Sequence, residues 1–227
     1  MIPLAFERLD KLGEDDVEQA AHVFVHSYMD ALTRVSSDPD VLIRLIRKSF
    51  IRKQFYAALW NHQVVGIMAY ATRGARSRRF DKSELQRILG TWKGWLFYLS
   101  VAREFHALRR LTDEECFLEA VATAPEHRGQ GIAAALLRHS IEQLPYRVFK
   151  LEVADTNVKA RRLYERQGFT VFYTKKQWLL PKAYGFRARQ FMKMERERAA
   201  FACPEEISGL RAEASADSAQ TPLPPSI

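Results

Sequence analysis

Cysteine is scarce in this 227-residue sequence, which contains only two. Cys116 lies inside an apolar run typical of a strand, and Cys203 stands at the start of a polar stretch. Neither has an obvious disulfide partner or a set of metal ligands at a fixed spacing. His22 and His26 are four residues apart, but no acidic or cysteine ligand accompanies them. We therefore expect two ordinary thiols, with no disulfide framework and no metal site.

Long apolar runs are also missing. No segment approaches the ~20 residues that a membrane-spanning helix needs. Glu7, Arg8 and Asp10 interrupt the apolar start that a signal peptide would require. We expect a cytoplasmic protein that makes no membrane contact.

Acidic residues are outnumbered, with 27 Asp and Glu against 35 Lys and Arg and a net charge of +8. Such a charge suits an anionic partner, which could be a nucleotide cofactor, a nucleic acid or an acidic membrane surface. No helix-turn-helix, zinc-finger or aromatic RNA-binding motif is present, which argues against nucleic acid. A basic cluster of four arginines could bind a phosphate, an acidic substrate or nucleic acid, although a solvated loop is the favoured interpretation: Arg73, Arg76, Arg78 and Arg79.

The composition indicates a globular protein, because 47% of the residues are hydrophobic and 27% are charged. The chain length suits a single domain, which we place at residues 1–200. Residues 82–111 have a helical pattern and form an insert that could cover a substrate pocket. Residues 201–227 are rich in Ala, Ser, Pro and Glu and are expected to be a disordered tail.

The periodicity of apolar residues predicts alternating strands and helices. Residues 2–9 suit a first strand, and acidic residues 14–16 begin a helix. Asp38 and Pro39 form a cap and first-turn pair for a basic amphipathic helix. Aromatic and β-branched runs at 55–60 and 64–71 predict a β-hairpin. The remaining expected elements are strand 116–123, helix 132–144, strand 148–154, helix 157–167, strand 169–174 and strand 187–194.

The strongest local signal is a glycine-containing loop, Pro125 to Ala133, between an expected strand and an expected helix. Gly129 and Gly131 let the backbone approach a ligand closely, and successive amides with the following helix dipole favour a pyrophosphate. The loop is neither a dinucleotide fingerprint nor a Walker A loop, because the third glycine and the Gly-Lys-Ser/Thr sequence are missing. On this loop alone, a turn without any ligand remains an open alternative.

The sequence resembles the GNAT family of acyl-CoA-dependent N-acyltransferases in two linked motifs. The cofactor loop of that family, Arg/Gln-x-x-Gly-x-Gly/Ala, is matched by Arg128, Gly131 and Ala133. A second element follows at the expected distance, with residues shared in order: Leu151, Glu152, Val153, Asn157, Ala160, Leu163, Tyr164, Glu165, Gly168 and Phe169. The clear resemblance covers residues 115–174, and no family motif matches residues 73–114.

The resemblance implies an α/β (α+β) fold with one central mixed, mostly antiparallel, twisted sheet that splays between its middle strands. It implies acetyl-CoA as co-substrate, with its pyrophosphate on the amides of the loop: Arg128, Gly129, Gln130, Gly131, Ile132 and Ala133. The strand edge at Ala122 and Thr123 would hydrogen-bond the pantetheine arm and the thioester oxygen, and Asn157 would bind the arm from the neighbouring strand's end. The acyl thioester would lie in the gap between the splayed strands.

Amide formation from a thioester needs a deprotonated amine, a polarised carbonyl and a proton for the departing thiolate. Tyr164 is the candidate acid, because the family uses a tyrosine at this position and because it lies about two turns beyond Asn157. A core tyrosine with a locally satisfied hydroxyl is the alternative. Glu119 is the candidate base, on one strand face with Glu115 and Val121 by the period of two, although strand glutamates are often only surface residues.

The function we predict is transfer of an acetyl group from acetyl-CoA to a primary amine of a small molecule, by direct attack in a ternary complex. Acetylation of protein lysines or N-termini is an alternative within the same fold. A non-catalytic CoA-binding module and a nucleic-acid-binding module are alternatives from other classes. The oligomeric state is open, with a homodimer as one candidate.

Overall fold

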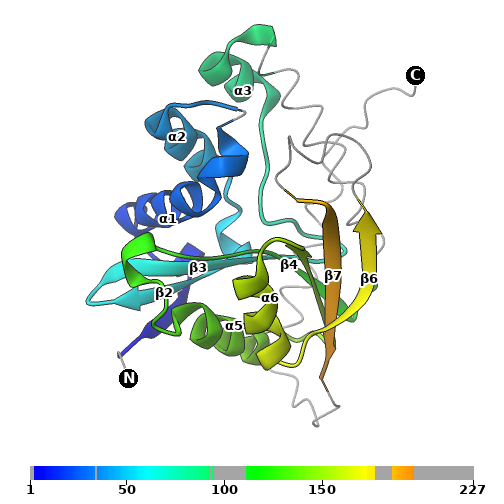
Figure 1. Ribbon diagram of the computed structural model, residues 1–227. Coiled ribbons are helices and arrows are strands. Elements are labelled where there is room, and N and C mark those ends of the chain that lie inside the picture. The colour runs from blue at the N-terminus through cyan, green and yellow to red at the C-terminus, as the bar shows by residue number, and fades with distance from the viewer. Residues whose placement is uncertain (1–2, 34, 93, 95–110, 177–185, 197–227) are drawn as a thin grey trace.

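The protein forms a seven-stranded sheet between two layers of helices, as a computed structural model shows (Figure 1). The structure describes residues 3–33, 35–92, 94, 111–176 and 186–196. The strand order is β1-β2-β3-β4-β5-β7-β6, and every neighbouring pair is antiparallel except the parallel pair β4–β5. The strands are β1 Ala5–Arg8, β2 Phe55–Trp60, β3 Gln63–Ala71, β4 Glu115–Thr123, β5 Val148–Ala154, β6 Thr170–Lys176 and β7 Ala188–Glu195. The predicted mixed, mostly antiparallel sheet is confirmed.

Each face of the sheet has its own hydrophobic core. Helices α1 (Glu14–Leu32) and α2 (Pro39–Ser49) cover one face, called here the α1 face. Helices α5 (Ile132–Gln143) and α6 (Val158–Arg166) cover the other, the α5 face. Figure 1 shows α1 and α2 above the sheet and α5 and α6 below it.

The first two helices begin where the sequence predicts. Asp38 caps α2 by accepting hydrogen bonds from the amides of Asp40 and Val41, with Pro39 in the first turn. At the start of α1 the Asp16 carboxylate accepts a hydrogen bond from the Gly13 amide at 3.1 Å. α1 bends at Tyr28, whose φ of −118° and ψ of 17° leave the helical region. Tyr28, at this bend, donates its hydroxyl hydrogen to the Val121 carbonyl near the end of β4.

The hairpin β2–β3 closes through Asn61 and His62, which have φ angles of 48° and 62°. Two consecutive left-handed residues match the twist of an antiparallel hairpin, and Asn tolerates that conformation better than most residues. The predicted hairpin is confirmed.

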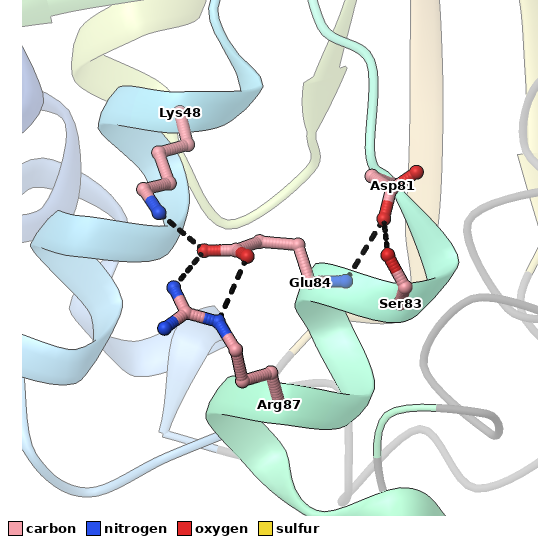
Figure 2. Close-up of polar contacts among 5 residues, drawn as sticks. All are labelled: Lys48, Asp81, Ser83, Glu84 and Arg87. Atoms are coloured by element: carbon pink, nitrogen blue, oxygen red, sulfur yellow. Dashed lines mark hydrogen bonds and ion pairs between the residues drawn. The ribbon is translucent and has the colours of Figure 1, made fainter.

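The insert begins with α3 (Lys82–Leu89), which packs against α2. Leu85 of α3 is fully buried, and Glu84 forms ion pairs with Lys48 from α2 and with Arg87 from its own helix (Figure 2). Arg87 and Lys48 lower the pKa of Glu84 to about 2. Above the ordinary pKa of a glutamate, the ionised Glu84 carboxylate stabilises the contact between α3 and α2. This stabilisation is lost as the pH falls through about 2.

Much of the remaining insert and the C-terminal tail lie outside the described residues. The helical pattern predicted for 95–110 and the disorder predicted for 201–227 are among them, as is Cys203. In the part of the chain that the structure describes, no helix is both long enough and apolar enough to cross a membrane.

Gly66 on β3 marks the closest approach between the sheet and α5. A Cβ added there would lie 3.1 Å from Cγ2 of Ile132 and 3.3 Å from the carbonyl oxygen of Ala122. The first neighbour is the side chain of a buried residue in the first turn of α5, and the second is a backbone atom of β4, so neither can move away easily. The missing side chain therefore lets β3 pack beneath the first turn of α5.

We predict that Gly66→Ala lowers the free energy of unfolding by about 1–3 kcal/mol, because the added methyl group overpacks this contact. Thermal unfolding measures the effect. Gly13→Ala is the matched control, since its methyl group would meet only a carboxylate oxygen of Asp16 at 3.6 Å. It should cost less than about 1 kcal/mol. Equal melting temperatures for Gly66→Ala and wild type would show that the contact is not tight.

Candidate functional site

The central feature of the site is a gap between β4 and β5. The two strands pair only from Glu115–Val148 to Leu118–Leu151, although β4 continues to Thr123 and β5 to Ala154. The last five residues of β4 therefore have no strand partner on that side. The resemblance implied such a splay. The register shows that the two strands separate after Leu118, and this point is called here the apex of the gap.

A β-bulge at Glu119 stands at this apex. Ala69 and Tyr70 are consecutive on β3, but they pair with Ala120 and Leu118, which leaves Glu119 unpaired. The bulge reverses the alternation of β4: Leu118 packs on the α5 face, whereas Ala120 packs on the α1 face.

The expected common face of Glu119, Glu115 and Val121 is therefore wrong for Val121, which packs on the α5 face. A period of two holds only in an uninterrupted strand, and the bulge shifts it by one residue.

The backbone of β4 beyond the bulge presents Val121 and Thr123 to the gap. The amide of Ala124 donates to the Val65 carbonyl on β3 at 2.9 Å, so Thr123, paired with Gly66, points its own amide and carbonyl away from β3. By alternation Val121 does the same. Ala122 instead faces β3, which overturns the expectation that its amide borders the gap; Val121 takes its place beside Thr123.

The gap-facing carbonyls already have partners, whereas the amides do not pair with a strand. Tyr28 donates its hydroxyl hydrogen to the Val121 carbonyl at 3.4 Å, and Ser27 donates to the Thr123 carbonyl at 3.4 Å. The hydroxyl oxygen of Thr123 is buried and has no hydrogen-bond partner in the described part of the chain. Such an orphaned polar atom fits a site that a ligand completes.

The glycine loop has the open geometry that an anion requires. Gly129 and Gly131 both have φ of +80°, and no atom lies within 4 Å of where their Cβ atoms would be. Gly131 is the N-cap of α5, and no side chain caps that helix. The amides at its start, including those of Ile132 and Ala133, therefore lack intrahelical acceptors and can bind a phosphate. Gln130 is exposed between the two glycines.

Arg128 holds the loop to the end of β4. Its Nε donates to the Thr123 carbonyl at 3.2 Å, and its Nη2 donates to the Ser27 hydroxyl at 3.4 Å. The guanidinium thus fixes the position of the loop relative to the strand and adds positive charge beside the glycines.

Asn157 lies past the end of β5 as the N-cap of α6. Its side-chain oxygen accepts a hydrogen bond from the Ala160 amide at 3.2 Å. The residue is exposed, and within the described ranges its side-chain amide nitrogen, Nδ2, has no hydrogen-bond partner. A ligand in the gap can therefore receive a hydrogen bond from this nitrogen.

Tyr164 is buried on α6 against Phe169, with ring centroids 6.0 Å apart. Within the described ranges no group hydrogen-bonds its hydroxyl, so the alternative of a locally satisfied phenol finds no partner there. Burial raises the pKa of Tyr164 well above its ordinary value, and Tyr28 adds to the increase. The phenol is therefore protonated at neutral pH.

Tyr28 and Tyr164 influence each other electrostatically. They come from opposite faces of the sheet, and yet the charge of one affects the pKa of the other. The sequence does not single out Tyr28, because its helical spacing from Val17 and Phe24 is that of an ordinary buried residue. The helix bend that aims it at β4 has no signature in the sequence.

Two carboxylates lie at the apex of the gap. Glu119 accepts a hydrogen bond from the buried hydroxyl of Ser77. Glu152 follows the last paired residue of β5 and forms an ion pair with Arg189 at 2.8 Å. The motif around Leu151 contained Glu152, but its place opposite Glu119 depends on the register. Glu115 is further away and pairs with Lys150 at 2.6 Å.

Cys116, His22 and His26 have no role in the chemistry considered for the gap. Burial raises the pKa of the Cys116 thiol well above its ordinary value, which keeps it protonated and poorly nucleophilic. His22 and His26 line a pocket of about 360 Å³ between α1, β3 and the start of the glycine loop. In the described ranges, no three His, Cys, Asp or Glu side chains gather as metal ligands.

Comparison with known proteins agrees with this geometry. The chain is 44% identical over 61 residues to the spore coat polysaccharide biosynthesis protein SpsD of Bacillus subtilis (strain 168). That match spans 26% of this chain and only 21% of the relative.

Solved structures share the fold. An N-acetyltransferase from Staphylococcus aureus Mu50 superposes with a TM-score of 0.56 at 16% identity, over 84% of this chain and 100% of that one. The ribosomal-protein-S18-alanine N-acetyltransferase from Escherichia coli superposes with a TM-score of 0.51 at 15% identity, over 89% and 99%. The model of the acetyltransferase (GNAT) family matches residues 22–169, more than half of the sequence, and the chain therefore belongs to the GNAT acetyltransferase family.

Proposed function

We propose that the protein is an N-acetyltransferase that transfers an acetyl group from acetyl-CoA to a primary amine of a small molecule. The observation that supports this proposal is the gap beyond Leu118, where backbone amides of β4 have no strand partner and two carboxylates lie at the apex, with the Tyr164 phenol within electrostatic reach of Tyr28. The SpsD relative is named for polysaccharide biosynthesis, which favours a small molecule over a protein as acceptor.

The residues of the gap fit bound acetyl-CoA, which supplies a thioester carbonyl that an amine can attack. The glycine loop would hold the pyrophosphate on the first amides of α5, with Arg128 holding the loop. Asn157 and the Thr123 side chain would orient the pantetheine arm. The amides of Val121 and Thr123 would stabilise negative charge on the thioester oxygen.

The proton transfers then belong to side chains on the two faces of the gap. The carboxylate of Glu119 accepts a proton from the amine, directly or through water, as the N–C bond forms. The phenol of Tyr164 donates its proton to the departing sulfur as the C–S bond breaks. Glu119 is preferred over Glu152 as the base because Glu119 accepts a hydrogen bond from the neutral Ser77 hydroxyl, whereas Glu152 is already ion-paired with Arg189.

We predict that Gly131→Ala raises the Kd for acetyl-CoA at least about tenfold, because the added methyl group would occupy space that the pyrophosphate needs. Isothermal titration calorimetry measures the binding. Gly90→Ala is the matched control, since Gly90 also has a positive φ, of +85°, and open surroundings. An alanine at Gly90, where ψ is 156°, is at least as strained as one at Gly131, where ψ is 2°, so strain alone would not weaken binding more in Gly131→Ala. Equal affinities for acetyl-CoA in the two variants would exclude the loop as the pyrophosphate site.

Tyr164→Phe should lower kcat by about 10²- to 10⁴-fold with little change in acetyl-CoA affinity, because only the proton donor is removed. A thiol-release assay follows turnover. No protein hydrogen bond to the hydroxyl is lost in the described residues, so the melting temperature should stay near that of wild type. Unchanged turnover would remove Tyr164 as the acid. Because its pKa is raised, kcat of wild type should not fall from ionisation of this phenol at mildly alkaline pH.

Glu119→Gln should lower kcat/KM by about 10²- to 10⁴-fold at neutral pH, and by less at a pH where the acceptor amine is already neutral. Glu152→Gln is the comparison variant on the other side of the apex. Initial rates across a pH series measure both. A larger loss in Glu152→Gln, together with near-normal activity of Glu119→Gln, would assign the base to Glu152 instead.

A further inference from the structure

The basic loop that begins at Arg73 is attached to the site rather than solvated along its whole length. The Ile51 amide donates to the Ser77 carbonyl at 2.8 Å, and the Arg79 amide donates to the Ser49 carbonyl at 2.7 Å. Arg78 forms a β-bridge with Phe50. These bonds hold the loop against the end of α2, which corrects the expectation of a free loop.

This attachment makes Arg78 the chain neighbour of a residue that contacts the candidate base. Ser77 is fully buried and donates its hydroxyl hydrogen to Glu119, and Arg78 follows it directly in the chain. The Arg78 guanidinium lies over the ring of Phe24, 5.1 Å from its centroid. Phe24 in turn packs against Tyr28, with ring centroids 4.8 Å apart.

Arg78 also acts electrostatically on the gap. Burial raises the pKa of Tyr28, and the positive charge of Arg78 opposes that increase. Tyr28 contacts the Val121 carbonyl and influences Tyr164. The guanidinium therefore lies on the α1 face of the sheet, over Phe24 and within electrostatic reach of Tyr28 at the gap.

The charge of Arg78 has no counterion in the described part of the chain. Arg73 on the same loop pairs with Asp113 at 3.0 Å, and Arg189 pairs with Glu152. Arg78 is half-buried, and a half-buried cation without a carboxylate is costly unless an anion joins it. A guanidinium that rests on an aromatic ring keeps its edges available for a carboxylate or phosphate.

We propose that Arg78 binds an anionic group, a carboxylate or a phosphate, on the acceptor, so that the substrate class is an amine with a negative charge near the reacting nitrogen. This inference rests on the proposed function, because it assumes that the acceptor enters beside Glu119. It gives the positive loop a role in selecting the acceptor, separate from the glycine loop.

The test compares wild type, Arg78→Gln and Arg73→Gln on matched pairs of amines. Free amino acids are paired with their carboxamides, and amino-sugar phosphates with the parent amino sugars. Rates come from thiol release, and affinities from calorimetry on protein saturated with CoA. Arg78→Lys is included because it retains the positive charge but loses the planar guanidinium with its paired N–H donors. Melting temperatures confirm that each variant is folded.

The expected result is that wild type prefers the anionic member of one pair by about 10- to 100-fold in kcat/KM or in Kd. Arg78→Gln should abolish that preference and leave the neutral member within about twofold, Arg78→Lys should retain part of it, and Arg73→Gln should retain all of it. The amino-acid arm and the phosphate arm then identify which anion is bound.

Three results would overturn the inference. The first is that wild type shows no preference for, and no binding of, the anionic amines in either arm. The second is that the preference survives in Arg78→Gln. The third is a loss in Arg78→Gln that appears with acetyl-CoA but not with 3′-dephospho-acetyl-CoA, which would place Arg78 on the cofactor. Wild type that acetylates neutral amines as fast as their anionic partners would refute only the role of Arg78, whereas wild type that binds no acetyl-CoA would refute the proposed function itself.

Discussion

The site depends on one constraint, which is that buried backbone groups must be hydrogen-bonded. Where β5 leaves β4, the carbonyls of Val121 and Thr123 would otherwise be orphaned. Tyr28, Ser27 and Arg128 satisfy them from α1 and from the glycine loop. These contacts tie α1, β4 and the loop into one unit and leave the amides of the same strand as donors for a ligand.

The bulge at Glu119 gives the two sides of the gap different chemistry. Before the bulge, β4 packs its buried residues on α5, and after it on α1. The carboxylate at the bulge is consequently held by Ser77 on the α1 face, while the phenol of Tyr164 enters from α6 on the opposite face. In the proposed reaction, base and acid therefore act from opposite sides of the sheet, which suits one proton entering with the amine and another leaving with the thiol.

The positive charge of the protein has distinct local roles around this site. Arg128 anchors the glycine loop, and Arg189 neutralises Glu152. Arg78 stacks on Phe24 without a carboxylate partner in the described residues. A net charge of +8 by itself indicates only an anionic partner, whereas in the proposed function these three positions would have separate cofactor, structural and acceptor roles.

The sequence alone determined the order of strands and helices, the cap at Asp38, the glycine loop and the candidate tyrosine, because periodicity, capping and local motifs are properties of neighbouring residues. It did not determine which backbone groups of β4 face the gap, since Ala122 and Val121 exchange roles through register and a bulge. Tyr28, Glu152 and Arg78 come from separate segments and have meaning only when α1, β5 and the basic loop meet at β4. Tertiary structure decided these features because strand pairing and helix bending depend on contacts between residues far apart in the chain.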